Sequence, residues 1–137
     1  MTDTTSNLIV LASPGVNQVA YYYNELSVDQ TRVLPVLFLR DAQGDYLHVQ
    51  SSTNDYRIER DGQGQVTAEY GVIQIYRDGE RSVLLVYGLG GESSMATAKV
   101  VSEFDQWGLT GHAMIVKYYD SNADGYLDTI AIVETVP

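Results

Sequence analysis

Two stretches of this sequence have helical periodicity, and the other apolar runs have the length of β-strands. Small or apolar side chains recur with helical spacing at positions 16, 19, 20, 23 and 26, and again at 96, 97, 100, 101 and 104. The strand-length runs lie at 7–12, 33–40, 46–50, 71–76, 81–88, 112–119 and 126–134. Strands that greatly outnumber helices predict a mixed β-sheet with two packed helices, of α/β (or α+β) class.

Turn residues between the strand-length runs predict several β-hairpins. The clearest hairpin joins GVIQIY (71–76) to RSVLLVYG (81–88), with Asp78-Gly79 at its tip. The chain has 137 residues, which is enough to bury one core. We therefore interpret residues 1–137 as a single domain.

The chain is strongly acidic, with eighteen Asp and Glu residues against eight Lys and Arg and a net charge of -10. Such a surface is repelled by nucleic acid, which we exclude as a partner. No apolar run reaches the ~18 residues that a membrane-spanning helix needs, which argues against direct membrane insertion. The absence of cysteine excludes disulfides, thiolate metal sites and cysteine nucleophiles.

Oxygen-bearing side chains recur at alternate positions in DSNADGYLD, residues 120–128. The candidate ligands are the side chains of Asp120, Asn122, Asp124 and Asp128 and the main-chain carbonyl of Tyr126. Ca²⁺ takes six to eight oxygen ligands, and Gly125 permits the sharp bend that wraps them around one point. This spacing predicts a Ca²⁺ site.

The predicted site is not an EF-hand, because its twelfth position is Ala131 rather than Glu and a strand-like run follows. It is typical of loops that join two strands in extracellular β-rich modules. The missing acid predicts a weak site, with a dissociation constant on the order of 10⁻⁴–10⁻³ M. Asp41 and Asp45 are candidates for a further ligand from a neighbouring loop. The alternative is an Asx-rich hairpin loop without metal.

A glycine-rich turn, GLGGES (88–93), follows a strand and precedes the second helix. Gly88, Gly90 and Ser93 approximate G-x-G-x-x-G, a pattern that presents backbone N–H groups to phosphate at a helix N-terminus. The turn lies in mid-chain, without a clear acidic residue about 20 residues further on to hold a ribose. We favour a structural turn in which Ser93 or Ser94 caps the helix and at least one glycine has a positive φ. A cytosolic α/β domain that binds a nucleotide or anion here is the alternative.

The sequence contains no comparable sign of catalysis. His48 and His112 are the only histidines and lack metal-ligand spacing, and the nucleophile motif G-x-S-x-G is absent. We therefore predict that the protein is not an enzyme.

Two blocks of sequence carry a family resemblance. NLIVLASPGVNQVA (7–20) combines a strand, a small-residue turn at Ala12-Ser13-Pro14 and a helix start containing Asn17. YGVIQIYRDGERSVLLVYGLGGESSMATAKVV (70–101) combines a Gly-Val-Ile strand, a glycine turn, an apolar strand ending in Tyr87-Gly88, and a helix rich in small residues. Together these blocks resemble archaeal S-layer (surface-layer) proteins.

The resemblance implies an extracellular, self-assembling structural domain of the cell surface, complete or part of a larger surface protein. Its implied partners are copies of itself or neighbouring surface-layer domains, in a homo-oligomer or polymer. Tyr21 falls on the polar face of the first predicted helix, between Asn17 and Glu25. Because tyrosine is enriched at protein contacts, we predict that Tyr21 is exposed and contributes to an inter-subunit contact.

Overall fold

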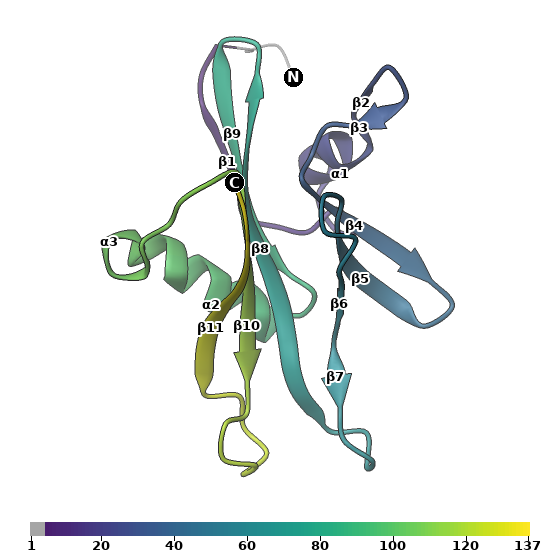
Figure 1. Ribbon diagram of the computed structural model, residues 1–137, viewed down its shortest axis with the longest axis vertical. Helices are drawn as coiled ribbons and strands as arrows, with labels where there is room; N and C mark the ends of the chain where they lie inside the picture. Colours follow the sequence, from purple (N-terminus) through teal and green to yellow (C-terminus); the bar gives the residue numbers. More distant parts are fainter. Residues whose placement is uncertain (1–4) are drawn as a thin grey trace.

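A computed structural model describes residues 5–137 of the chain (Figure 1). A central β-sheet, sheet A, has helices α2 and α3 on one face, and helix α1 and strands β4–β6 on the other. The predicted mixed sheet with packed helices is thereby confirmed, in the α+β form.

Sheet A has the strand order β1-β9-β8-β10-β11, with β7 paired to the start of β8. Its strands are β1 (Leu8–Val10), β7 (Glu59–Arg60), β8 (Val66–Asp78), β9 (Arg81–Gly88), β10 (Ala113–Tyr119) and β11 (Thr129–Val136). Among the described strands, β1 and β9 are parallel and the other neighbours are antiparallel. The predicted β8–β9 hairpin is confirmed, with Asp78 opposite Arg81 and Gly79 in the left-handed region at a φ of 61°.

Sheet C is a separate antiparallel meander of β4 (Val36–Asp41), β5 (Gly44–Val49) and β6 (Asp55–Arg57). A small hairpin of β2 (Ser27–Val28) and β3 (Thr31–Arg32), which the sequence patterns did not predict, precedes it.

The described part of the chain has three helices, α1 (Gln18–Glu25), α2 (Gly91–Ser102) and α3 (Phe104–Trp107). The first helix starts later than its apolar pattern suggests. Asn17 Oδ1 accepts hydrogen bonds from the backbone N–H of Val19 (2.9 Å) and Ala20 (3.0 Å), so the helix begins there. Val16 precedes this cap and is 84% exposed. No helix among the described residues has the length and apolar character needed to cross a membrane.

The second helix also departs from its predicted wheel. Ala96, Thr97 and Val100 are buried as expected. The helix ends at Ser102, and the new turn of α3 leaves Phe104 66% exposed instead of on the buried face.

Each face of sheet A contributes to a hydrophobic core, since successive side chains of a strand point to opposite sides and another layer packs on each face. Val72 and Ile115 lie in the larger core, between sheet A and the layer formed by α1 and sheet C. Their neighbours Ile73 and Val116 lie in the smaller core, which includes Val100 of α2. One sheet therefore supports two hydrophobic cores.

Strand β1 is an edge strand, although a continuous apolar run such as residues 7–12 is typical of a buried strand. It has one neighbour, β9, and lies at the end of the sheet. Val10 is buried, whereas Ile9 is 67% exposed and Leu11, just after the strand, is 65% exposed. A short apolar run has the same appearance at the edge of a sheet as in its middle, so the sequence did not distinguish the two.

Candidate functional site

The predicted Ca²⁺ loop connects β10 to β11 at one end of the molecule. The backbone N–H of Asp120 donates to the carbonyl of Thr67 (3.0 Å), and that of Asp128 donates to the carbonyl of Tyr119 (3.0 Å). These two bonds hold the start and the end of the loop against the strands of sheet A. Gly125 has a φ of 92°, so the predicted glycine bend is confirmed.

Asp120 organises the interior of this loop. Its Oδ1 accepts from the backbone N–H of Asn122 and Asp124 (both 3.3 Å), and its Oδ2 accepts from that of Gly125 (2.8 Å). Asn122 Oδ1 in turn accepts from the N–H of Asp124 (3.3 Å), and Asp124 Oδ1 from the N–H of Tyr126 (2.9 Å). The alternating Asp and Asn side chains thus accept hydrogen bonds from the loop's own backbone. An Asx-rich hairpin loop without metal would have the same hydrogen bonds.

Three carboxylates of the loop also converge in space. One oxygen from each of Asp120, Asp124 and Asp128 lies within 4.8 Å of the other two. Oxygen ligands bind Ca²⁺ at about 2.3–2.6 Å, so two ligands on opposite sides of one ion are about 5 Å apart. The triad therefore has a spacing that a single Ca²⁺ ion can bridge.

Asp128 is held in its ionised form by local hydrogen bonds. Its Oδ1 accepts from the hydroxyl of Thr129 (2.8 Å) and from the backbone N–H (3.1 Å) and hydroxyl (3.0 Å) of Ser121. The bond from Thr129, followed by those from Ser121, lowers the pKa of the Asp128 carboxyl. A carboxylate that stays charged is the form that a hard cation binds.

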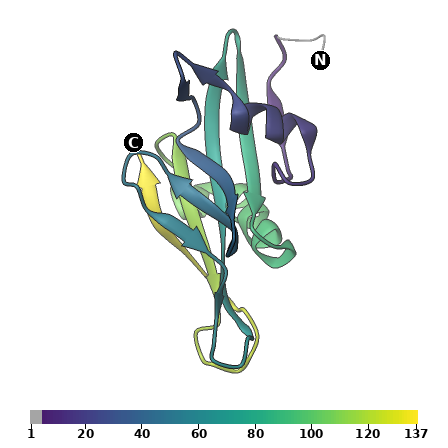
Figure 2. The same ribbon diagram turned by 90° about the vertical axis from the view of Figure 1, so that its right-hand side faces the viewer.

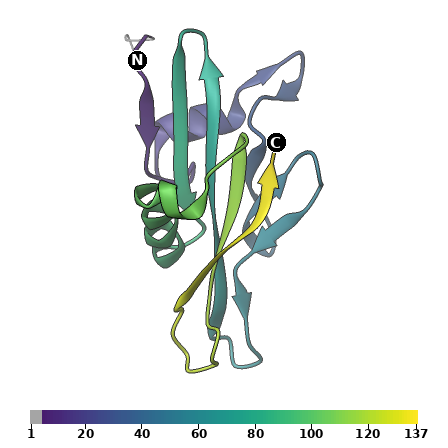
Figure 3. The ribbon, with the colours of Figure 1, turned by 60° about the vertical axis from the view of Figure 1, so that its left-hand side comes forward.

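The loop beside the candidate site is not the one we expected. Asp41 is paired with Arg57 and Asp45 with Arg40, each with a shortest N–O distance of 2.5 Å, so both acids are engaged in sheet C. The expectation that Asp41 or Asp45 supplies a further ligand was wrong. The β7–β8 turn lies beside the loop instead, at the lower end of Figures 2 and 3, and Gln65 Nε2 donates to the carbonyl of Gly125 (3.0 Å).

The glycine-rich turn before α2 already holds an anionic group of the protein. Glu69 Oε1 accepts from the backbone N–H (3.2 Å) and the hydroxyl (2.8 Å) of Ser93, and Glu69 is only 8% exposed. The N-cap residue is Gly90 rather than Ser93 or Ser94, so the predicted serine cap was wrong. Ser93 lies at the third helical position instead, and its Oγ accepts from the N–H of Gly90 (3.0 Å). A carboxylate thus lies where a bound phosphate would contact the helix N-terminus.

Gly88 and Gly90 are needed for space rather than for a positive φ. None of Gly88, Gly90 and Gly91 has a positive φ, so that prediction was wrong. A Cβ atom on Gly88 would lie 2.3 Å from Ser93 Oγ, and one on Gly90 would lie 2.3 Å from Glu69 Oε1. Close approach of the Glu69 carboxylate explains the glycine at position 90 without a ligand.

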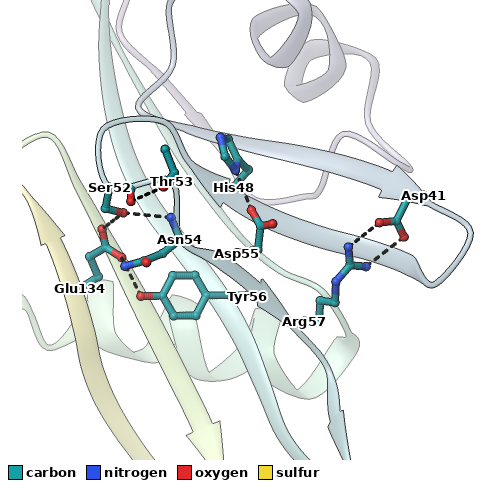
Figure 4. Close-up of polar contacts among 9 residues, drawn as sticks. All are labelled: Asp41, His48, Ser52, Thr53, Asn54, Asp55, Tyr56, Arg57 and Glu134. Atoms are coloured by element: carbon teal, nitrogen blue, oxygen red, sulfur yellow. Dashed lines mark hydrogen bonds and ion pairs between the residues drawn. The ribbon is translucent and has the colours of Figure 1, made fainter.

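A polar cluster that the sequence did not predict links sheet C to β11 (Figure 4). The carboxylate of Glu134 accepts from the side chains of Ser52 (2.6 Å), Asn54 (2.9 Å) and Tyr56 (2.6 Å). Burial opposes ionisation of Glu134, but the three hydrogen bonds outweigh it and lower the pKa of its carboxyl. The donors lie about 80 residues from Glu134 in the chain, so no local sequence pattern could have revealed them.

Neither histidine lies in a recognisable catalytic arrangement. His48 Nδ1 is 2.6 Å from Asp55 Oδ1 on the neighbouring strand, and Figure 4 shows Ser52 directed to Glu134 rather than to this pair. His112 Nδ1 is 2.8 Å from the carbonyl of Pro137. Both contacts have a structural explanation.

Comparison with family models, with curated proteins and with solved structures finds no match to this chain. The resemblance to archaeal S-layer proteins accordingly stays a prediction.

Proposed function

We propose that this chain is a non-enzymatic structural domain that binds Ca²⁺ in the loop between β10 and β11. The observation that carries the proposal is the convergence of the Asp120, Asp124 and Asp128 carboxylates within 4.8 Å of one another. Three like charges in one short loop repel each other, and a divalent cation removes that repulsion while it fixes the loop. Asn122 Oδ1 and the carbonyl of Tyr126 are the proposed neutral ligands, and water completes the shell.

The proposed setting is the cell surface, where the domain assembles with copies of itself or with neighbouring surface-layer domains. A weak site, with a dissociation constant on the order of 10⁻⁴–10⁻³ M, is filled at extracellular Ca²⁺ concentrations and largely empty in cytosol. The resemblance to S-layer proteins supports the same setting. Tyr21 was predicted to be exposed, and it is 57% exposed. Its ring is therefore available for a contact between subunits.

Thermal unfolding in chelator and in millimolar Ca²⁺ tests the metal site. If free Ca²⁺ reaches ~100 times the dissociation constant, binding stabilises the fold by about 2.7 kcal/mol, which raises the melting temperature by about 10 °C. Mg²⁺ at the same concentration serves as the control, because its smaller, octahedral shell fits this loop less well. A melting curve that is the same in chelator and in Ca²⁺ would reduce the loop to an Asx-rich turn.

The alternative, a nucleotide or anion at the turn before α2, has less support. Glu69 already binds Ser93 at the helix N-terminus, and a phosphate there would be repelled by its carboxylate. Saturable binding of ATP or inorganic phosphate by calorimetry, lost in Gly90→Ala, would favour this alternative.

A further inference from the structure

One edge of sheet A is open. Strand β1 pairs with β9 along one side, and no other described strand pairs with its other side. Figure 3 shows β1 at the outer border of the sheet. The backbone groups of such an edge are available to a further strand.

The opposite edge of the same sheet, strand β11, is linked to another part of the fold. Strand β11 carries Glu134, whose carboxylate is bound by side chains of Ser52, Asn54 and Tyr56 from the neighbouring sheet C segment. Charged side chains and covering segments are the usual means by which proteins prevent strand addition at an edge. Strand β1 itself carries no charged side chain, because Leu8, Ile9 and Val10 are all apolar.

The segment that forms this edge has no charge. Residues 5–24 contain no Asp, Glu, Lys or Arg, although the whole chain has a net charge of -10. Two copies of so acidic a chain repel each other over most of their surfaces, and this repulsion is smallest where an uncharged segment meets another. A basic partner, by contrast, would gain nothing from a neutral edge. The charge distribution therefore favours a second copy of this chain as the occupant.

An exposed apolar row leads up to the edge on the face of sheet A that carries α2. Ile9 lies opposite Leu84, and Leu84 lies opposite Ile75, so the row crosses β1, β9 and β8 in register. Ile9 is 67% and Ile75 is 40% exposed. Leu84 and Ile75 also line a shallow apolar hollow that continues to Leu109. Helix α2 leaves this part of the sheet uncovered.

We propose that two copies of the chain associate through their β1 edges, antiparallel and around a two-fold axis near Ile9. Such a contact is self-complementary, because each β1 presents the same backbone groups to the other. The contact also joins the apolar rows of the two copies into one continuous row. The two Ile9 side chains lie next to each other at its centre. This inference specifies a contact for the proposed self-assembly and rests on that proposal, but it does not require Ca²⁺.

Disulfide crosslinking provides a direct test, because the chain has no cysteine of its own. Ile9→Cys places one thiol at the proposed axis, where facing side chains are about 5 Å apart. Met95→Cys, on α2 and 74% exposed, is the matched control. Under mild oxidation at equal protein concentration, we expect at least about tenfold more covalent dimer from Ile9→Cys than from the control. Equal yields from the two variants would overturn the proposal.

Sedimentation of the full chain provides the second test. We expect a concentration-dependent dimer that Ile9→Lys weakens by about tenfold or more, since it sets two like charges against each other. Lysine lowers the net negative charge, so weaker association cannot come from greater overall repulsion, and Met95→Lys controls for the charge change. A wild-type chain that stays monomeric at all concentrations, or an Ile9→Lys variant that folds and dimerises like the wild type, would contradict the β1 contact. Each measurement is made in chelator and in Ca²⁺, so that failure of the metal site is distinguished from failure of the edge contact.

Discussion

The side chain of Gln74 pairs with the backbone of Val36 in the way that a neighbouring β-strand would. Its Oε1 accepts from the N–H of Val36 (3.0 Å), and its Nε2 donates to the carbonyl of the same residue (2.9 Å). Asn24 makes the same two bonds with Phe38, at 2.8 Å and 2.9 Å. Because Val36 and Phe38 are two positions apart on β4, both carboxamides serve the same edge of that strand.

These two carboxamides join β4 to sheet A and to α1. Gln74 is on β8 of sheet A and Asn24 is on α1, and they are 1% and 2% exposed. Buried backbone groups need partners, and an edge strand packed inside a protein has none of its own on one side. The edge of β4 can therefore be buried against sheet A and α1 without loss of hydrogen bonds.

Gln74→Leu is expected to lower the free energy of unfolding by about 3 kcal/mol. The variant keeps the side chain's bulk but leaves the N–H and the carbonyl of Val36 buried and unpaired. Chemical denaturation at neutral pH measures the loss. Gln63→Leu, at an exposed turn, is the control and should stay within about 0.5 kcal/mol of the wild type. A loss no greater than the control's would show that water or a shift of β4 satisfies these groups.

Gly90→Ala is expected to destabilise the domain by about 2 kcal/mol. The added Cβ would lie 2.3 Å from Glu69 Oε1 and would displace the carboxylate from Ser93. Gly91→Ala is the matched control, because a Cβ there meets nothing within 4 Å and alanine is the better helix former. In thermal unfolding, the melting temperature of Gly90→Ala should therefore lie below that of the wild type and that of Gly91→Ala above it. Equal effects of the two substitutions would mean that the Glu69 contact does not constrain the turn.

Features of this fold that depend on a few neighbouring residues could be predicted from the sequence, whereas contacts between distant residues could not. Two features follow from the spacing of a few residues and could therefore be predicted. They are the β8–β9 hairpin and the glycine bend of the 120–128 loop. Asn24 is a polar residue of α1, yet it is buried, because its partner Phe38 lies on β4, distant in the sequence. The contact of Glu69 with Ser93 spans 24 residues and depends on how β8 meets α2. Hydrophobic periodicity identifies elements, but it does not reveal which buried polar groups will be paired.

Glu134→Gln is expected to reduce the stability of the domain at pH 7 by about 1 kcal/mol and to flatten its acid dependence. The pKa of Glu134 is lowered from its ordinary value of 4.5 in the folded protein, so folding favours the charged form. Its contribution is complete above pH ~4.5 and is lost as the pH falls through the lowered pKa of the folded state. Urea denaturation between pH 3 and pH 7 follows the effect. Parallel curves for wild type and variant over this range would exclude a role for this carboxylate in the acid dependence.

Tyr21→Ser is expected to weaken self-association without lowering thermal stability. The ring is 57% exposed on α1, whereas the adjacent side chain of Tyr23 is fully buried. Sedimentation over a range of concentrations measures the association. Tyr23→Ser gives the contrasting result, since it removes a core ring and should lower the melting temperature sharply. If Tyr21→Ser associates over the same concentration range as the wild type, Tyr21 is an incidental surface residue.

Asp124→Asn is expected to change stability in opposite directions with and without Ca²⁺. In chelator, the variant removes one of three converging carboxylates and keeps the oxygen that accepts from the N–H of Tyr126, so its melting temperature should equal or exceed that of the wild type. In Ca²⁺, the variant has lost a charged ligand and should forgo most of the roughly 2.7 kcal/mol of binding stabilisation. Asp29→Asn, in the exposed turn between β2 and β3, is the control for an Asp to Asn change and should respond to Ca²⁺ as the wild type does. Since an ordinary Asx turn predicts no dependence on metal, a variant that differs from the wild type by the same amount in chelator and in Ca²⁺ would rule out the metal site.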